Sequence, residues 1–229
     1  MNMMNFPQAG DYIDIHTHGG KPVPGNFIIE SLMAHEVTAL LNNAPGVAFS
    51  YGIHPWFLTE NTFEKQISSV KVFVDRPEVI AIGEAGFDKL QGPSPVIQRE
   101  AFEEQAKLAD EYNKPLIIHC VRAWEELLTA HKKLKPKTPW LIHGFRGTTQ
   151  LATQLLLKGL YLSLWFDFAL RSESSDLLRT LPKSRIFLET DGAEVNIRDI
   201  YEKVAKDMVI SVEELKRIIQ ANFSEVFRS

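Results

Sequence analysis

Short runs of apolar and β-branched residues recur along the chain, separated by polar stretches rich in glycine, proline, asparagine and aspartate. Runs of this length and composition are typical of strands. They predict eight strands, over Tyr12–His16, Phe27–Met33, Val47–Ile53, Val79–Gly83, Leu116–His119, Trp140–His143, Leu160–Leu164 and Arg185–Glu189.

Helical patterns fall between the strands after the third run. In Gln98–Asn113, the apolar residues Phe102, Ala106 and Ala109 recur on one face of a helix. Ser211 and Glu214 have the spacing of a capping box, which favours a helix start at that point. Further helices are predicted over Val121–Leu134, Thr148–Lys158, Ser172–Leu181, Ile197–Asp207 and Val212–Phe227.

Strands that alternate with helices indicate a parallel sheet and an α/β fold. Eight such strands in 229 residues predict a compact (β/α)8 TIM-type barrel, with residues 1–229 forming a single domain. Only about ten residues separate the first two strands, which is too few for a crossover helix. We therefore expect the barrel to be distorted there, or these strands to be joined by an extended loop.

Composition narrows the classes of function. Hydrophobic residues make up 45% and charged residues 24%, which excludes a disordered or collagen-like chain. The one cysteine, Cys120, cannot form an intramolecular disulfide or a thiolate metal cage, and it fits a reducing cytoplasm. We see no signal-peptide pattern, no membrane-spanning run and no coiled-coil seam, and therefore expect a cytoplasmic monomer. The net charge of −4 argues against a non-specific nucleic-acid coat.

Histidines and carboxylates stand where the predicted strands end. His16 and His18 alternate along a strand, so both imidazoles can reach one point at its carboxyl end. Glu84 follows an apolar strand and lies among small residues that allow close approach. In a β/α barrel this end of the strands is the catalytic rim. The same pattern recurs downstream at His119, at His143, and at Glu189 with Asp191.

Imidazoles and carboxylates without thiols suit zinc, manganese, iron, cobalt or nickel, whereas magnesium prefers more oxygen ligands. The four histidines, Glu84 and one acid from the last strand end make six ligands, more than the three that one catalytic zinc ion needs, so two metals bridged by a carboxylate fit better. Four neutral histidines, one glutamate and one aspartate carry a charge of about −2, and two divalent ions would add about +4. The resulting positive centre suits a phosphodiester substrate.

These residues, in this order, resemble the TatD-like metal-dependent hydrolases of the amidohydrolase superfamily. The resemblance covers nearly the whole chain, and it implies a β/α barrel that holds two divalent ions (Zn, Mn or Mg) and hydrolyses phosphodiesters, typically as a DNase. The matching segments are His16–His18, Gly52–Pro55, Gly83–Asp88, Gln98–His119, His143–Gly147, Glu189–Asp191 and Asn222–Phe227.

Carried over residue by residue, the family pattern makes His16 and His18 ligands of one metal. Glu84 would bridge the two metals. His119 and His143 would hold the second metal. Asp191 would bind the first metal and orient or deprotonate the attacking water, so that Asp191 and Glu84 are the implied catalytic residues.

Substrate contacts are less well defined. His54 could donate to a phosphate oxygen or hold its own loop. Arg146 and Arg122 could pair with phosphate, although a structural ion pair for Arg146, or a helix-capping or solvent-facing place for Arg122, fits equally well. Trp56 and Phe57 offer either a stacking surface for a base or ordinary rim packing.

Two further residues have structural interpretations: Asp88 as a helix cap or surface acid, and Cys120 as a packing residue turned away from the barrel interior.

The chain departs from the family pattern at several places. The segment between His18 and Gly52 is shorter than usual, and the residues after His119, His143 and Asp191 differ from the common ones. These departures affect substrate choice rather than the ligand set. Besides a DNA-cleaving enzyme, two alternatives remain: an amidohydrolase-type C–N or ester hydrolase, for example in aminoacyl-RNA deacylation, and a metal-binding protein without catalysis.

Overall fold

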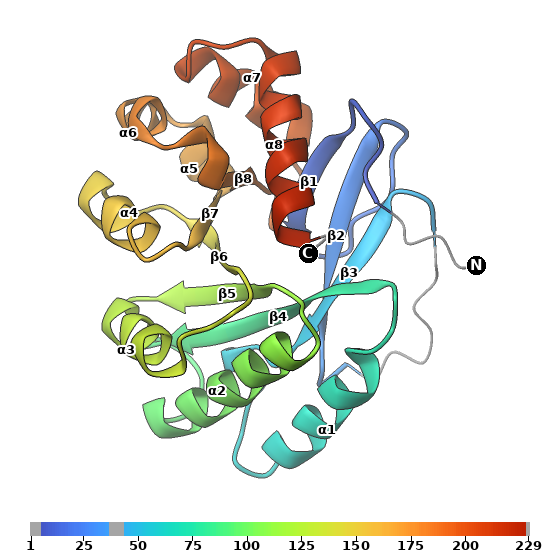
Figure 1. Cartoon of the computed structure of the whole chain (residues 1–229), viewed down its shortest axis with the longest axis vertical. Coiled ribbons are helices and arrows are strands. Elements are labelled where there is room, and N and C mark those ends of the chain that lie inside the picture. Colours follow the sequence, from blue (N-terminus) through green and yellow to red (C-terminus); the bar gives the residue numbers. More distant parts are fainter. Residues whose placement is uncertain (1–5, 37–43, 228–229) are drawn as a thin grey trace. The chain divides into compact units, whose positions relative to one another are not determined.

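The computed structural model describes residues 6–36 and 44–227. It contains eight strands that follow one another in chain order in one sheet. The strands are β1 (Tyr12–Thr17), β2 (Asn26–Met33), β3 (Val47–Gly52), β4 (Val79–Asp88), β5 (Leu116–Val121), β6 (Trp140–Phe145), β7 (Tyr161–Leu164) and β8 (Ile186–Leu188), labelled in Figure 1. The pairs β1–β2, β3–β4, β4–β5 and β7–β8 are parallel.

Helices follow β3 and every later strand. The last two helices begin and end at the predicted residues. The backbone N–H of Glu214 donates to the Ser211 hydroxyl, which is one of the two hydrogen bonds of the expected capping box. The helices are α1 (Phe63–Phe73), α2 (Pro95–Glu111), α3 (Trp124–Leu134), α4 (Thr149–Leu156), α5 (Phe166–Leu170), α6 (Ser175–Thr180), α7 (Ile197–Asp207) and α8 (Val212–Phe227), with short 3-10 turns η1 (Pro55–Phe57), η2 (Ser172–Ser174) and η3 (Lys183–Arg185).

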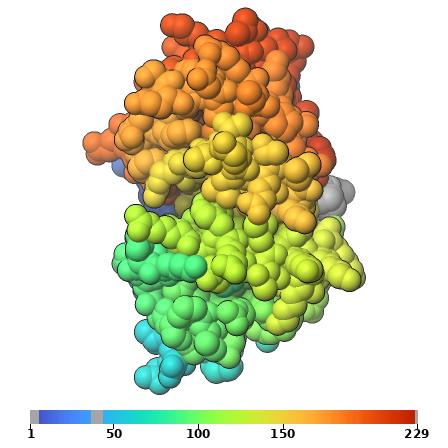
Figure 2. Space-filling view, turned by 90° about the vertical axis from the view of Figure 1, so that its left-hand side faces the viewer, coloured from blue at the N-terminus to red at the C-terminus, as the bar shows by residue number. Residues whose placement is uncertain are grey.

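The described chain packs as two compact units. Unit 1 holds residues 31–36 and 49–141, and unit 2 holds residues 6–30, 44–48 and 142–227. In unit 1, α2 packs on β4 and β5, and Phe102 of α2 is fully buried beside Phe87 of β4. In unit 2, α7 and α8 pack on β1 and β8, while the segment from α4 to α6, yellow to orange in Figure 2, lies at the surface of the face drawn.

Within unit 2 the first strand lies beside the last. The backbone N–H of Thr190, just past β8, donates to Oδ1 of Asp14 in β1 at 3.1 Å, and the N–H of Asp191 donates to the carbonyl of His16 at 3.1 Å. A sheet in chain order whose last strand meets its first has the topology of the predicted (β/α)8 barrel.

The connection between β1 and β2 contains no helix, since residues 18–25 form a loop. The pairing of the two strands also shifts register between Asp14 and Thr17. Both features agree with the distortion predicted from the short spacing. No helix in the described part of the chain is long and apolar enough to cross a membrane.

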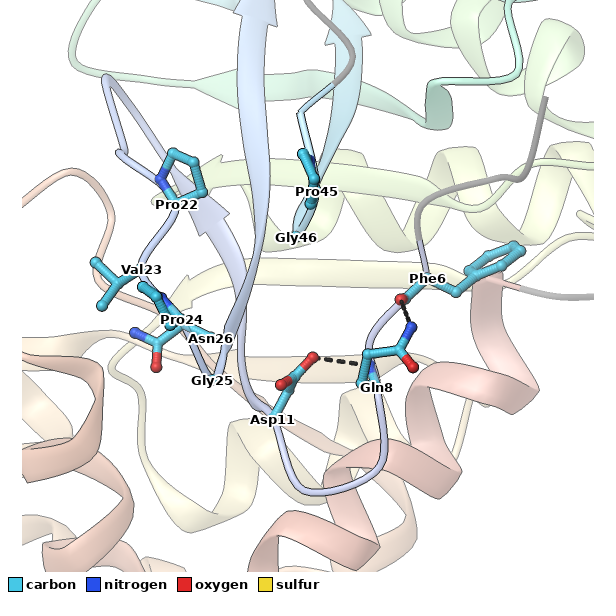
Figure 3. Close-up of a pocket in the computed structure, with 10 residues that line it drawn as sticks. All are labelled: Phe6, Gln8, Asp11, Pro22, Val23, Pro24, Gly25, Asn26, Pro45 and Gly46. Carbon is cyan, nitrogen blue, oxygen red and sulfur yellow. Dashed lines mark hydrogen bonds between the residues drawn. The ribbon is translucent and has the colours of Figure 1, made fainter.

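A cavity of about 470 Å³ lies at the amino-terminal ends of β1 to β3 in unit 2 (Figure 3). Pro22, Val23 and Pro24 of the β1–β2 loop line one side, and Pro45 lies before β3. Its one carboxylate, Asp11, already accepts from the backbone N–H of Gln8 at 2.7 Å. The cavity therefore lacks the donor sets found at the other end of the strands.

Candidate metal centre

Unit 1 gathers three donors from neighbouring strands: His54 just after β3, Glu84 in β4 and His119 in β5. One donor atom from each lies within 4.8 Å of the others, and all three residues are buried. Oε2 of Glu84 lies 3.5 Å from Nε2 of His54 and 3.7 Å from Nδ1 of His119. The strand β4 continues to Asp88. Glu84 therefore lies inside the strand, whereas the sequence analysis placed it at the strand's end.

Asp88 fixes which nitrogen of His119 faces Glu84. Oδ2 of Asp88 lies 3.1 Å from Nε2 of His119 and accepts from Nε1 of Trp56 at 2.6 Å. Burial by itself raises the pKa of Asp88, but hydrogen bonds from Trp56, Leu90 and His119 outweigh it and leave the pKa below its usual value. An ionised Asp88 makes Nε2 the protonated nitrogen of His119, and the lone pair of Nδ1 then faces Glu84.

His54 has the opposite arrangement. Its Nδ1 accepts a hydrogen bond from the backbone N–H of Trp56 at 3.1 Å, so the neutral ring carries its proton on Nε2. Nε2 is the atom that faces Glu84. Of the two histidines beside Glu84, His119 therefore presents a lone pair suited to a metal ion, and His54 presents a donor.

Close packing of β4 on β5 brings Glu84 and His119 together. A Cβ atom on Gly86 would lie 1.8 Å from the carbonyl oxygen of His119, so only glycine fits at this position. The pairing of Gly86 with His119 in the parallel register explains the small residues around Glu84 that the sequence showed.

Unit 2 gathers the second donor set, from β1, β6 and the segment after β8. His16, His143 and Asp191 each offer an atom within 4.8 Å of the others. Oδ1 of Asp191 lies 3.6 Å from Nε2 of His16 and 3.8 Å from Nε2 of His18. The rings of His16 and His143 lie 4.2 Å apart between centroids.

The backbone after β8 aims Asp191 at these histidines. Asp191 has a φ of +53°, and Gly192 has a φ of +74°. A Cβ atom on Gly192 would meet the Cβ and carbonyl oxygen of His18 at 3.1 Å. Glycine at this position therefore suits both the left-handed backbone and the close approach of His18.

Two buried acids lie behind this set. Glu189 accepts from the backbone N–H of Gly144 at 2.6 Å, and its Oε1 lies 3.7 Å from Nδ1 of His143. Asp14 accepts from the hydroxyl of Thr190 at 2.6 Å, and burial raises its pKa to about 7. The sequence singled out Glu189 as a strand-end acid without giving it a role, and it gave no signal for Asp14, whose partner Thr190 lies at the far end of the chain.

The separations within both sets fit ions better than hydrogen bonds. The three distances from His16, His18 and His119 to a carboxylate oxygen run from 3.6 to 3.8 Å, longer than a good hydrogen bond. Two ligands about 2.1 Å from a tetrahedral ion lie about 3.4 Å apart. The donor types and their spacing therefore suit divalent cations.

Two of the predicted substrate contacts, Arg146 and Arg122, are exposed, whereas the third, His54, is buried. The guanidinium of Arg146 lies 4.1 Å over the ring of Trp165, and it has no carboxylate partner within the described chain. Arg122 is exposed in a left-handed backbone conformation (φ +53°), likewise without an ion pair among the described residues. A cavity of about 640 Å³ opens beside His18 and is lined by Lys21 and Arg198.

The interpretation of Asp88 from the sequence, as a helix cap or a surface acid, was wrong. Asp88 is buried at the end of β4, and although Oδ1 accepts from the backbone N–H of Leu90, Oδ2 contacts His119 and Trp56. The sequence carried a signal for a role of Asp88 in the site, because Asp88, and not Glu84, is the acid at which this apolar strand ends.

Comparison with known proteins gives consistent matches. The family model described as TatD related DNase matches residues 26–228. The 3'-5' ssDNA/RNA exonuclease TatD of Cronobacter turicensis is 33% identical over 67% of this chain, which spans 60% of that protein. The Escherichia fergusonii protein of the same name is 28% identical over 89% of this chain and 81% of its own length. The crystal structure of YJJV, a TatD homologue from Escherichia coli, covers 97% of this chain and 100% of its own, with a TM-score of 0.79 at 23% identity, and confirms the barrel fold.

Proposed function

Because this chain belongs to the TatD-related DNase family, we propose that it is a metal-dependent phosphodiesterase that cleaves single-stranded nucleic acid. The observation that carries the proposal is the set of mostly buried imidazole and carboxylate donors whose separations suit divalent ions. In TIM-type barrels, catalytic residues lie at the carboxyl-terminal parts of the strands, and these donors come from four strands and from the segments after β1, β3 and β8.

The donor chemistry suggests how the ligands divide. We assign His16, His18 and Asp191 to one divalent ion, His119 and His143 to a second, and Glu84 to both. The lone pair of His119 Nδ1 that faces Glu84 supports this assignment. His54 would remain outside the ligand set, because its Nε2 carries a proton. When bound, such ions supply Lewis acidity and favour the ionisation of water near neutral pH.

The remaining chemistry belongs to the side chains. Asp191 would accept the proton of the attacking water, which requires it to lie within hydrogen-bond reach of that water. His54 would donate from Nε2 to Glu84 or to an oxygen of the phosphate. Arg146 and Arg122 would pair with the phosphates that flank the cleaved bond.

The charge of the chain favours short, unpaired substrates. A net charge of −4 provides no broad basic surface for a long duplex. The curated relatives are named as exonucleases of single-stranded DNA and RNA, which agrees with a substrate held mainly near the metal site. We further propose that the protein works as a monomer in the cytoplasm, where the partly buried thiol of Cys120 stays reduced.

Hydrolysis assays with matched variants test the function. The metal-loaded protein should shorten labelled single-stranded DNA and hydrolyse bis(p-nitrophenyl) phosphate. Asp191→Asn keeps a residue that tolerates a positive φ but cannot accept the proton, and it should lose activity by at least about 100-fold. The exposed Asp176→Asn serves as the control. Cleavage of esters or amides with no action on phosphodiesters would instead support an amidohydrolase-type reaction, and unchanged activity in Asp191→Asn would contradict the proposal.

A further inference from the structure

Two large aromatic side chains stay exposed beside the donor set of unit 1. Trp56 is 42% exposed and Phe57 is 43% exposed, although both follow the buried Pro55 in the 3-10 turn η1. Adjacent exposed aromatic rings next to a candidate active site are typical of a binding surface. The exposure of the two rings is not incidental, because contacts with neighbouring residues hold both rings in place.

The rings form a continuous row that begins at two of the donors, His119 and His54, whose centroids lie 4.4 Å apart. Centroids are 5.5 Å apart between His119 and Trp56, 4.9 Å between Trp56 and His54, and 5.7 Å between His54 and Phe57. Phe57 in turn stacks on His35, with centroids 4.1 Å apart and planes inclined by 25°. The row therefore runs from His119 to the surface at His35.

Hydrogen bonds fix this row before any ligand arrives. The indole N–H of Trp56 donates to Asp88 at 2.6 Å, and the backbone N–H of Trp56 donates to His54. At the other end, the backbone N–H of Ala34 donates to the carbonyl of Gly52 at 2.8 Å, which ties the segment of His35 to the end of β3. Rings held in this way lose little entropy when a flat ligand stacks on them.

We propose that Trp56, Phe57 and His35 form a stacking platform for an unpaired nucleobase of the substrate. The inference rests on the proposed function, which it extends to substrate selection. The carboxylates of Asp88 and Glu36 border the row, so the platform would repel a phosphate but accept the neutral face of a base. A paired base is covered by its neighbours in a duplex, and the platform therefore selects single strands.

Equilibrium binding tests the platform without hydrolysis. A fluorescently labelled short oligothymidylate with phosphorothioate linkages is compared by anisotropy with an abasic strand of the same length and charge. Base stacking should make the metal-loaded wild-type protein bind the base-bearing strand roughly 5- to 150-fold more tightly. Phe57→Leu keeps apolar bulk without a π face and should reduce this preference at least about threefold.

The controls separate stacking from folding and from catalysis. The double variant Trp56→Leu with Phe57→Leu should abolish the preference, whereas Val72→Ala, at a 70% exposed residue of α1, should retain it. A wild-type protein without preference, or a double variant that keeps it, overturns the platform. If the preference is present but no phosphodiester is hydrolysed with any divalent ion, the proposed function fails and the platform stands.

Discussion

Replacing Asp88 by asparagine tests the claim that an outer carboxylate orients His119 for metal binding. Asp88 accepts four hydrogen bonds: from Trp56 at 2.6 Å and His119 at 3.1 Å on one oxygen, and from the backbone N–H groups of Leu90 at 2.7 Å and Gln91 at 3.1 Å on the other. Asparagine has the same shape but a single acceptor oxygen.

Either orientation of the new amide breaks the arrangement. If its oxygen faces Leu90 and Gln91, its NH2 group faces the donors of Trp56 and His119, and His119 must move its proton to Nδ1. The lone pair then no longer faces Glu84. If the amide is flipped, two backbone donors lose their acceptor, which costs roughly 1–3 kcal/mol each.

The loss of metal affinity expected for Asp88→Asn can be estimated. Removing a hydrogen-bonding partner of a metal ligand typically lowers metal affinity about 10- to 100-fold. At about 1.4 kcal/mol per tenfold change, this corresponds to roughly 1.4 to 2.8 kcal/mol of binding free energy. We expect Asp88→Asn to fall within this range.

Competition with a chromogenic chelator measures the affinity. The control is Asp176→Asn, the same chemical change at a side chain that is 95% exposed. Thermal unfolding of both metal-free variants shows whether Asp88→Asn has merely unfolded the site. Equal metal affinity in a folded Asp88→Asn protein would refute the proposed proton placement on His119.

Three further predictions follow from the site and its surroundings. His54→Gln should retain both metals by elemental analysis, because His54 donates rather than ligates, but the lost hydrogen bond to a charged group should lower kcat about 10- to 100-fold. Loss of a metal would show that His54 is a ligand. Burial raises the pKa of Cys120 to about 12 from about 9. Alkylation at pH 8 should therefore be about 1,000-fold slower in the native than in the unfolded protein, and fast native alkylation would contradict this. Ionisation of the thiol should also lower the stability of the folded protein as the pH rises from 9 to 12. Gly86→Ala should lower the urea-unfolding free energy by at least about 3 kcal/mol or prevent folding, whereas Gly159→Ala, with nothing within 4 Å, should cost about 1 kcal/mol.

The sequence could predict what repeats along the chain. Eight apolar runs gave the eight strands, and the bounds of α7 and α8 agreed with their apolar stripes and start signals. The sequence analysis gave no bounds for α1, because its pattern is mixed: Gln66 is buried with Ile67 and Val70, while Val72 is 70% exposed. A face that buries an amide and exposes a valine has a weak helical period.

Contacts between distant residues were beyond sequence reasoning. Whether His54 donates or ligates depends on its bond to the backbone of Trp56, and the ring of Trp56 reaches Asp88, 32 residues further along the chain. Asp14 is paired with Thr190, 176 residues away. Apolar periodicity identifies which residues end a strand, but it does not identify the partner that sets the proton on a histidine.

Metal content with and without Glu84 tests the central claim most directly. Elemental analysis of the purified protein should give about two divalent ions per chain, and Glu84→Gln should lose at least one of them while Asp176→Asn keeps both. Activity on phosphodiesters should fall with the ions. A folded Glu84→Gln protein that keeps the full metal content, or a wild-type protein that binds one ion or none, would contradict a carboxylate-bridged pair of metals.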